Sequence, residues 1–326
     1  MNTIAARTTL AVVLGIIAGC AYGLITRLVF TPGMSSVWST MSCTFLLAAP
    51  FVMGFITVAI APPSARSNRG YALFAPWLSC VALFGVVMFF ALEAAICIVM
   101  AAPVFLGLST TGGLIAFALF RKQDAKRSPV TLAVLILPYL LSPLESQLPE
   151  PNAIRLVHTE IVIDAPESSV WANIARVARI QANEQSFSLL HLIGLPKPVE
   201  ATLSFDGVGG VRHASFDNGL TFIETVNAWQ PNKHIAFSIK PDMPTTSNPF
   251  NAIGGRYFDV LDGSYTIERV PGGKIKLSLD SHERITTRFN VYGGWWTDLI
   301  MRDLQNYILQ IVKVRSERTG DHLLTS

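Results

Sequence analysis

Long runs of apolar residues, separated by short polar segments, fill the first 144 residues of the chain. The runs cover residues 8–30, 38–60, 71–120 and 129–144. One helical pass through the hydrocarbon core of a bilayer takes about 20 residues, so the third run is long enough for two passes that turn near Glu93. The last run is shorter than a full pass, and Pro138 could kink it. The pattern predicts a bundle of four or five transmembrane helices in residues 1–144.

Three glycines spaced four residues apart, Gly15, Gly19 and Gly23, give the first run a face of small residues. Such faces allow two helices to approach closely. The first interpretation is packing against other helices of the same bundle. The second is a homo-oligomer that forms through these glycines.

The pattern of apolar positions changes after a linker at residues 145–152. Beyond it, apolar and polar residues alternate with the period of two that half-buried strands show. Four segments place apolar side chains on one face in this way. These faces hold Leu203 and Phe205; Leu220, Phe222, Glu224 and Val226; Ile235, Phe237 and Ile239; and Leu277, Leu279, Ser281, Glu283 and Ile285. Turn sequences between the segments, such as "DNG" at 217–219, predict an antiparallel sheet.

Two segments of the second half follow a helical pattern. The first begins near Pro166, whose missing N–H is harmless in a first helical turn. The second, residues 295–317, has a long apolar stripe, and polar residues such as Gln305 lie largely off that stripe. A sheet with one apolar face can curl around such a stripe. The sequence therefore predicts, after the transmembrane bundle, an α+β helix-grip domain with a cavity between its sheet and its last helix.

Three motifs occur in order along the second half: "IVIDAPESSVWANI" at 161–174, "FIETVNAWQPNKHIAFSI" at 222–239 and "GSYTIERVPGGKIKLSLDSHERI" at 263–285. With these motifs, residues 153–318 resemble the SRPBCC family, also called START-like or Bet v 1-like, which includes polyketide cyclase/dehydrase and lipid-transport proteins; 319–326 remain as a tail. The resemblance implies a helix-grip pocket for an apolar ligand. Many members only bind or carry, some are cyclases, and the family has no universal catalytic residues to transfer.

Composition agrees with a membrane protein, because 51% of the 326 residues are hydrophobic and only 14% are charged, against roughly 25% charged in average soluble domains. The net charge is +3, and the basic residues form no stripe suited to a phosphate backbone, which excludes nucleic acid as a partner. The six histidines and four cysteines show no metal-ligand spacing, and the glycines at 207–210 precede a strand and not a helix. We therefore expect neither a metal nor a cofactor.

Basic residues beside the apolar runs indicate the orientation of the bundle. They are Arg7, Arg66, Arg69, Arg121, Lys122, Lys126 and Arg127. The positive-inside rule places all of them, and the N-terminus, in the cytoplasm. We expect an integral protein of a bacterial inner membrane with its second half in the periplasm, or in the cytoplasm if the run 129–144 does not span.

Two carboxylates, Glu224 and Glu283, share their strand faces with apolar residues. Burial in a cavity would raise the pKa of such a group, which could then orient a polar ligand head or act as a general acid or base. Both are catalytic candidates on this interpretation. The alternative is a wet rim or a structural salt bridge to Arg212, Arg256 or Arg284.

The cavity predicts a set of ligand-binding residues on the strands, on the last helix and beside a loop. The set comprises Phe222, Glu224, Arg256, Phe258, Leu279, Glu283, Trp296 and Ile300. The loop, residues 248–255, could cover the pocket mouth as a gate or as a membrane-contacting loop, with Arg256 meeting an anionic head group. Alternatively, it could be an ordinary connection with Arg256 exposed.

Together these features favour membrane-tethered binding, and transfer, of a hydrophobic, lipid-like ligand. The expected partners are the lipid bilayer and a hydrophobic small molecule. Two alternatives stay open. One is a cyclase-like or hydrolase-like enzyme that uses Glu224 or Glu283 on an apolar substrate, and the other is a sensor that reports ligand occupancy to the membrane helices.

Overall fold

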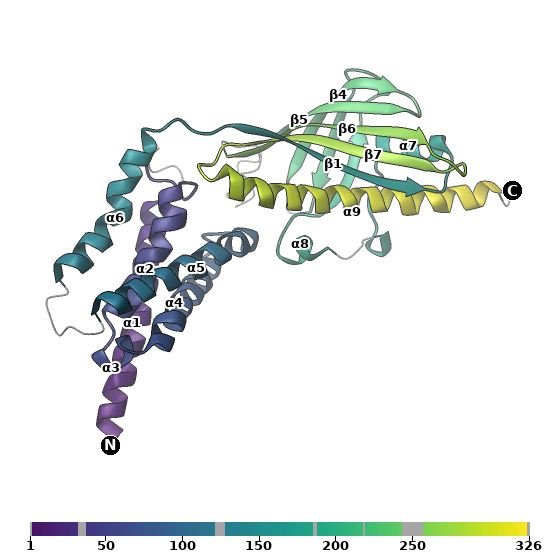
Figure 1. Cartoon of the computed structure of the whole chain (residues 1–326). Helices are drawn as coiled ribbons and strands as arrows, with labels where there is room; N and C mark the ends of the chain where they lie inside the picture. Colours follow the sequence, from purple (N-terminus) through teal and green to yellow (C-terminus); the bar gives the residue numbers. More distant parts are fainter. Residues whose placement is uncertain are drawn as a thin grey trace. The chain divides into compact units, whose positions relative to one another are not determined.

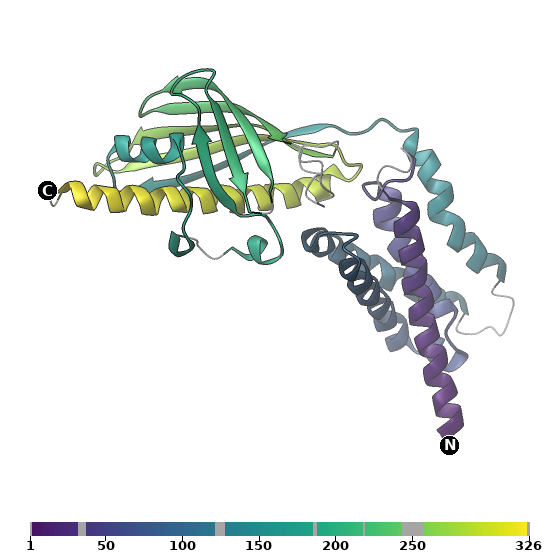
Figure 2. The same ribbon diagram turned by 180° about the vertical axis from the view of Figure 1, so that it is seen from behind.

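The computed structural model describes residues 2–31, 37–120, 128–184, 188–217, 219–242 and 257–324. The chain divides into two compact units, Met1–Glu150 and Pro151–Ser326, whose elements are labelled in Figure 1 and seen from behind in Figure 2. Each unit is built on a different principle, helix against helix in the first and helix against sheet in the second.

The first unit is entirely helical in its described part. Its elements are α1 (Asn2–Val29), the π-helical η1 (Thr44–Ala48), α2 (Ala49–Ala59), α3 (Pro63–Arg66), α4 (Arg69–Phe89), α5 (Ala95–Phe120) and α6 (Ser128–Ser146). Four described helices are long and apolar enough to cross a membrane, namely α1, α4, α5 and α6. The predicted turn near Glu93 is confirmed, because α4 ends at Phe89 and α5 begins at Ala95.

The run 38–60 differs from its prediction as a full pass. It forms only a shorter apolar helix, Thr44–Ala59, and all but one of the α2 residues are buried. A helix that is apolar on every side belongs in the interior of its protein. Helix α2 accordingly contacts α1, α4, α5 and α6, and it is the central helix of the unit.

Glycines allow the neighbours of α2 to approach its backbone. A Cβ atom at Gly54 of α2 would lie 1.8 Å from the carbonyl oxygen of Ser109, and one at Gly112 of α5 would lie 1.9 Å from that of Phe51. Gly15 of α1 packs in the same way against the carbonyl oxygen of Thr57, and Gly19 packs against the Thr57 hydroxyl.

The third glycine of the α1 face, Gly23, packs against Met53 and Leu83. The small-residue face of α1 therefore packs within its own unit, as the first interpretation predicted. A homo-oligomer through the same glycines stays a prediction.

The second unit is a seven-stranded antiparallel sheet with the strand order β1-β7-β6-β5-β4-β3-β2. The strands are β1 (Ala153–Ile163), β2 (Pro198–Leu203), β3 (Val211–Phe216), β4 (Thr221–Gln230), β5 (His234–Asp242), β6 (Phe258–Arg269) and β7 (Ile275–Ile285). Helix α9 (Asn290–Leu324) lies along the concave side of the curled sheet, and α7 (Glu167–Ala175), η2 (Ala182–Glu184) and α8 (Leu189–Leu192) connect β1 to β2 (Figures 1 and 2). This arrangement is the predicted helix-grip fold.

The predicted strand faces are confirmed with one exception. On β7, Leu277, Leu279, Ser281, Glu283 and Ile285 are all buried. Phe205 is the exception, because β2 ends at Leu203 and Phe205 is 53% exposed in the following turn. That turn uses Gly207 and Gly209 at positive φ, so the glycine-rich segment is the hairpin connection between β2 and β3.

Helix α9 begins at Asn290, earlier than the predicted Trp295. It ends at Leu324, so it includes most of the predicted tail 319–326. The side-chain oxygen of Asn290 accepts hydrogen bonds from the backbone N–H and the hydroxyl of Thr287, at 2.7 and 2.9 Å. Pro166 directly precedes α7 in an extended conformation, and the helix starts at Glu167. Both helices are thus set by local residues at their N-terminal ends.

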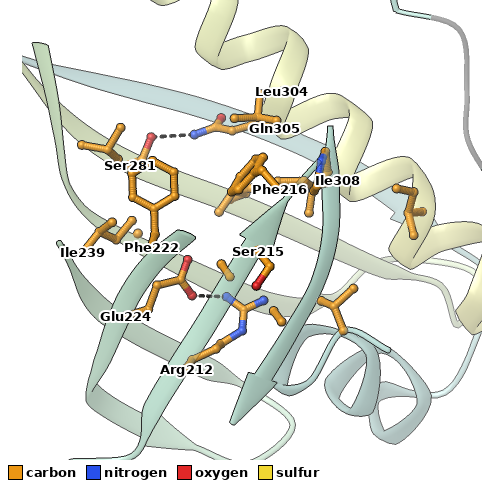
Figure 3. A pocket seen from close by; sticks show the side chains of 18 of the residues that line it. Arg212, Ser215, Phe216, Phe222, Glu224, Ile239, Ser281, Leu304, Gln305 and Ile308 are labelled. Atoms are coloured by element: carbon orange, nitrogen blue, oxygen red, sulfur yellow. Dashed lines mark hydrogen bonds and ion pairs between the residues drawn. The ribbon is translucent and has the colours of Figure 1, made fainter. Parts of the chain in front are cut away.

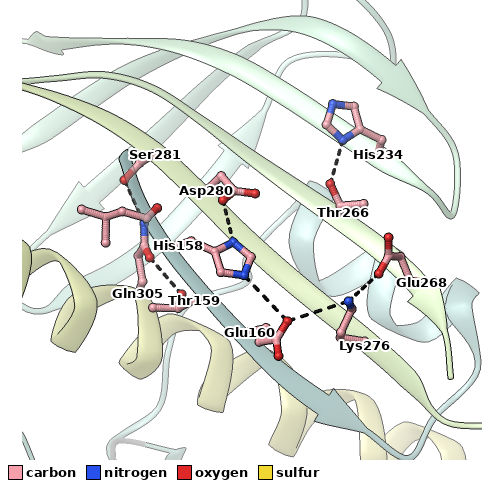
Figure 4. A network of polar contacts seen from close by, with 11 residues as sticks. His158, Thr159, Glu160, His234, Thr266, Glu268, Lys276, Asp280, Ser281 and Gln305 are labelled. Atoms are coloured by element: carbon pink, nitrogen blue, oxygen red, sulfur yellow. Dashed lines mark hydrogen bonds and ion pairs between the residues drawn. The ribbon is translucent and has the colours of Figure 1, made fainter. Parts of the chain in front are cut away.

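A buried glutamine on α9 contradicts the prediction that its side chain lies off the packed stripe. Gln305 is 3% exposed. Its Oε1 accepts a hydrogen bond from the Thr159 hydroxyl at 2.9 Å, and its Nε2 donates to the Ser281 hydroxyl at 2.8 Å (Figure 4). The amide therefore joins α9 to β1 and β7 at once.

The two glycines between α2 and α5 give a direct test of the first unit. Replacement of Gly112 by Ala places a methyl group against backbone, which cannot move aside as a side chain would. Overpacking of this kind costs about 1–3 kcal/mol or more. We expect Gly112→Ala to lower the thermal denaturation temperature of the full chain in detergent by several degrees.

Gly107, on the same helix, is the matched control, because a Cβ there meets nothing within 4 Å. Gly107→Ala should leave the denaturation temperature unchanged or raise it slightly. Equal effects of the two substitutions would contradict the close α2–α5 packing.

Candidate functional site

A cavity of about 160 Å³ lies between the concave face of the sheet and α9. About 10–15 Å³ of such space is enough for one water molecule, so the cavity has room for an organic ligand. Most of its wall is apolar (Figure 3). Apolar lining residues include Phe216, Leu220, Phe222, Phe237, Ile239, Phe258, Leu279, Ile300, Leu304 and Ile308.

The wall also carries a buried ion pair. Arg212 on β3 and Glu224 on β4 are direct cross-strand partners, and Nη1 of Arg212 donates a hydrogen bond to Oε2 of Glu224 (Figure 3). Their side chains are 5% and 9% exposed. The structural salt bridge that the sequence offered as an alternative for Glu224 is therefore present, and it lies on the cavity wall.

Two aromatic rings surround the ion pair. The guanidinium carbon of Arg212 lies 5.4 Å from the ring centroid of Phe237, and Tyr265 lies beside both charged groups. Gly263 is opposite Phe237 in the neighbouring strand, and a Cβ there would come within 2.7 Å of the Phe237 ring. The glycine thus makes the space in which the ring lies under the guanidinium.

Burial and mutual attraction act in opposite directions on the ion pair. Burial raises the pKa of Glu224 above its ordinary value, although Arg212 opposes this. For Arg212, burial alone would lower the pKa, but Glu224 and Tyr265 beside it raise the pKa above its ordinary value. The guanidinium is therefore charged, and it offers a fixed positive group next to a carboxylate.

Arg315 closes another part of the cavity wall. Its Nε and Nη2 donate to the carboxylate of Glu184 at 2.9 and 2.8 Å, and its guanidinium also donates to the carbonyl oxygens of Ala178 and Arg179. The hydrogen bonds from Arg315 lower the pKa of Glu184 to about 2. This pair holds the α7–α8 connection against α9.

The structure places the predicted ligand-binding residues in three groups. Phe222, Glu224, Phe258, Leu279 and Ile300 line the cavity. Glu283 and Trp296 are buried but are not part of its wall. Arg256 and the whole candidate gate 248–255 lie outside the described residues.

Glu283 forms a separate buried site near the start of α9. Its side chain has no exposed surface, and neither carboxylate oxygen has a hydrogen-bond partner within the described chain. Next to it, Asp298 accepts a hydrogen bond from Nε of Arg155 at 2.8 Å. Burial raises the pKa of Glu283 to about 7 from an ordinary value of 4.5; Asp298 adds to this, while Thr297 and Arg155 oppose it.

Sequence reasoning missed Tyr265, Gln305 and Arg315 as residues of the cavity wall, and it considered Arg212 only as a partner for Glu224. The alternation of β3 could have placed Arg212 on the same face as Ala214 and Phe216, which also line the cavity. Among the described residues, no group of three or more His, Cys, Asp or Glu side chains could hold a metal ion.

Comparisons with known proteins find similarity only among solved structures. No family model matches the chain, and no curated protein matches it. An uncharacterized protein from Rhizobium leguminosarum is 16% identical at a TM-score of 0.33, with 52% of this chain and 99% of that one covered. Truncated norcoclaurine synthase from Thalictrum flavum is 11% identical at a TM-score of 0.32, and the match covers 51% of this chain and 96% of the synthase. DynU16, a protein from the dynemicin biosynthetic locus, is 14% identical at a TM-score of 0.26, and the match covers 50% of each chain.

The raised pKa of Glu283 predicts a pH-dependent stability. The folded state keeps the proton up to about pH 7, whereas the unfolded chain releases it near pH 4.5. The folded state therefore loses stability as the pH rises between these values, by at most about 3 kcal/mol at about 1.4 kcal/mol per pH unit. Relative to Glu283→Gln, we expect amide hydrogen exchange in β7 and the first turns of α9 to be about tenfold faster at pH 5.5 and at least about a hundredfold faster at pH 8.

The comparison at each pH cancels the intrinsic pH dependence of exchange. Glu268→Gln, which removes a half-exposed carboxylate of the sheet, is the control and should show no such difference. A ratio between wild type and Glu283→Gln that does not change with pH would contradict the assignment.

Proposed function

We propose that the second unit binds a lipid-like apolar molecule in the cavity between its sheet and α9, and that the first unit anchors it in a membrane. The observation that carries the proposal is the wall of the cavity, which is apolar except for a few fixed polar groups. Cavities of this composition are typical small-molecule sites. The apolar wall would hold the body of the ligand, and the ion pair would orient a polar group on it.

Binding is favoured over catalysis by the arrangement of the two candidate carboxylates. Glu224 is held by Arg212, and Glu283 is buried away from the cavity wall. A general acid or base needs a free path to the proton that it moves. The pair Arg212–Glu224 is better suited to orienting a bound molecule than to proton transfer.

The basic segments support five crossings of the membrane. If α2 did not cross, Arg66 and Arg69 would lie on the opposite side from Arg7, against the positive-inside rule. Residues 44–59 reach about 24 Å as a helix, slightly less than the ~30 Å hydrocarbon core, and the burial of α2 among longer helices offsets the shortfall. Five crossings would place the second unit outside the cytoplasm, in the periplasm of a bacterial cell.

An apolar stripe on α9 further supports a position at a membrane surface. Val291, Trp295 and Leu299 follow one another at intervals of four residues and are 93%, 58% and 43% exposed. Asn290, beside them, donates a hydrogen bond to the carbonyl oxygen of Pro151 at the start of the second unit. The stripe would contact the interfacial region of a bilayer, where Trp is favoured.

Fusions to reporter proteins test the number of crossings. We expect alkaline phosphatase fused after residue 326 to be active and a green fluorescent protein fused there to be dark. Both reporters should behave in the opposite way when fused after residue 125, between α5 and α6. A fluorescent fusion at the C-terminus would contradict the periplasmic assignment.

Photolabelling tests the cavity itself. The full chain in detergent is irradiated with a fatty alcohol that carries a diazirine, and the labelled peptides are identified by mass spectrometry. We expect labels on peptides of β4, β5 and α9 that line the cavity, and a reduction of at least fivefold in Ile308→Trp, which fills the space.

Gln310→Trp adds the same ring on the exposed side of α9 and should leave the cavity labels unchanged. Labels on the apolar helices of the first unit serve as an internal standard. Labels confined to those helices, or equal labelling of the cavity in all three proteins, would contradict the proposal.

A further inference from the structure

Apart from Glu200, the charges on the cavity wall are balanced in pairs. Among the described residues, the charged side chains of the wall are Glu200, Arg212, Glu224 and Arg315. Arg315 is neutralised by Glu184, and Arg212 by Glu224. Glu200, on the edge strand β2, is only partly buried. The deep part of the cavity therefore has strong local dipoles and little net charge.

A charged ligand head would gain little from this balance. A carboxylate near Arg212 would also be close to Glu224, and an ammonium group near Glu224 would be close to Arg212. Removing an ion from water costs several kcal/mol, and only an uncompensated opposite charge repays this cost. The ion pair of the wall supplies none.

An uncharged head that both donates and accepts hydrogen bonds would match the ion pair. A guanidinium carries five N–H donors and no acceptor, whereas a carboxylate has acceptors only. The contact between Arg212 and Glu224 uses Nη1, and the two side chains keep 5% and 9% of their surface exposed on the cavity wall, where a ligand atom can meet them. In Figure 3 the guanidinium and the carboxylate lie side by side among the apolar lining residues. A hydroxyl group could donate to one and accept from the other.

We infer that the Arg212–Glu224 pair, together with Tyr265, selects apolar ligands with a neutral hydroxyl head over ligands with a carboxylate or ammonium head. This inference rests on the proposed function, because it names the ligand class of the same cavity. The pair acts as a neutral head-group subsite. Its specificity comes from charge balance, and the apolar wall contributes the affinity for the chain of the ligand.

Competition among three ligands of equal chain length tests the inference. The full chain in detergent is labelled with a diazirine-bearing decanol in the presence of decanol, decanoate or decylammonium at pH 7.5. In the wild type, we expect decanol to halve the labelling of cavity peptides at a concentration at least tenfold below that of either charged competitor.

Glu224→Gln leaves the charge of Arg212 unbalanced. We expect decanoate to compete at least tenfold better in this variant than in the wild type, relative to decanol. Partition of each competitor into detergent micelles is the same for every variant, so it cancels in this comparison. Glu283→Gln removes a buried carboxylate outside the cavity wall and should keep the wild-type order.

The outcomes distinguish a failure of the proposed binding function from a failure of the head-group preference. If no probe labels the cavity peptides of the wild type, the proposed binding function fails. If the probes label the cavity but decanoate or decylammonium competes as well as decanol, only the head-group inference is overturned. If a variant does not fold, the wild-type order, corrected for the measured partition of each competitor into micelles, decides the head-group inference.

Discussion

The contact between α9 and the concave face of the sheet determines both the stability of the second unit and the existence of its cavity. The helix packs through two separate apolar clusters. Leu309 and Val312 belong to the large core with β1, β5, β6 and β7, whereas Met301 belongs to a small cluster with Val157 and Val260. Between them, Gln305 binds β1 and β7. The helix is thus held on both sides of Gln305, and along this stretch the cavity lies between α9 and residues of β3, β4 and β5.

Two buried carboxylates in this unit show how differently the same group can be used. Glu224 is stabilised by a guanidinium on the neighbouring strand and lies where a ligand can reach it. Glu283 lacks hydrogen-bond partners in the described chain. An unpaired buried charge is expensive enough that the group takes up a proton instead. In the proposed function the first carboxylate orients the ligand, whereas the second links the packing of the start of α9 to pH.

Much of the fold could be predicted because period-two and helical patterns report directly which side of an element is buried. This held for β4, β5 and β7, and for the long last helix. It failed where burial depends on partners far away in the chain. Gln305 is buried because Thr159 and Ser281 satisfy its amide, and no local pattern announces such partners. Apolar length alone likewise did not show that the run 38–60 is the short, central helix of its bundle.

The Arg212–Glu224 pair also constrains how this cavity can change over evolutionary time. Loss of either partner leaves an isolated charge in an apolar wall, at a cost of about 3–5 kcal/mol, whereas an apolar replacement of both is often neutral or stabilising. Intermediate sequences with one partner would therefore fold poorly. The two positions should vary together among descendants of this chain, and a lineage that lost the pair would keep the pocket with an entirely apolar lining at this point.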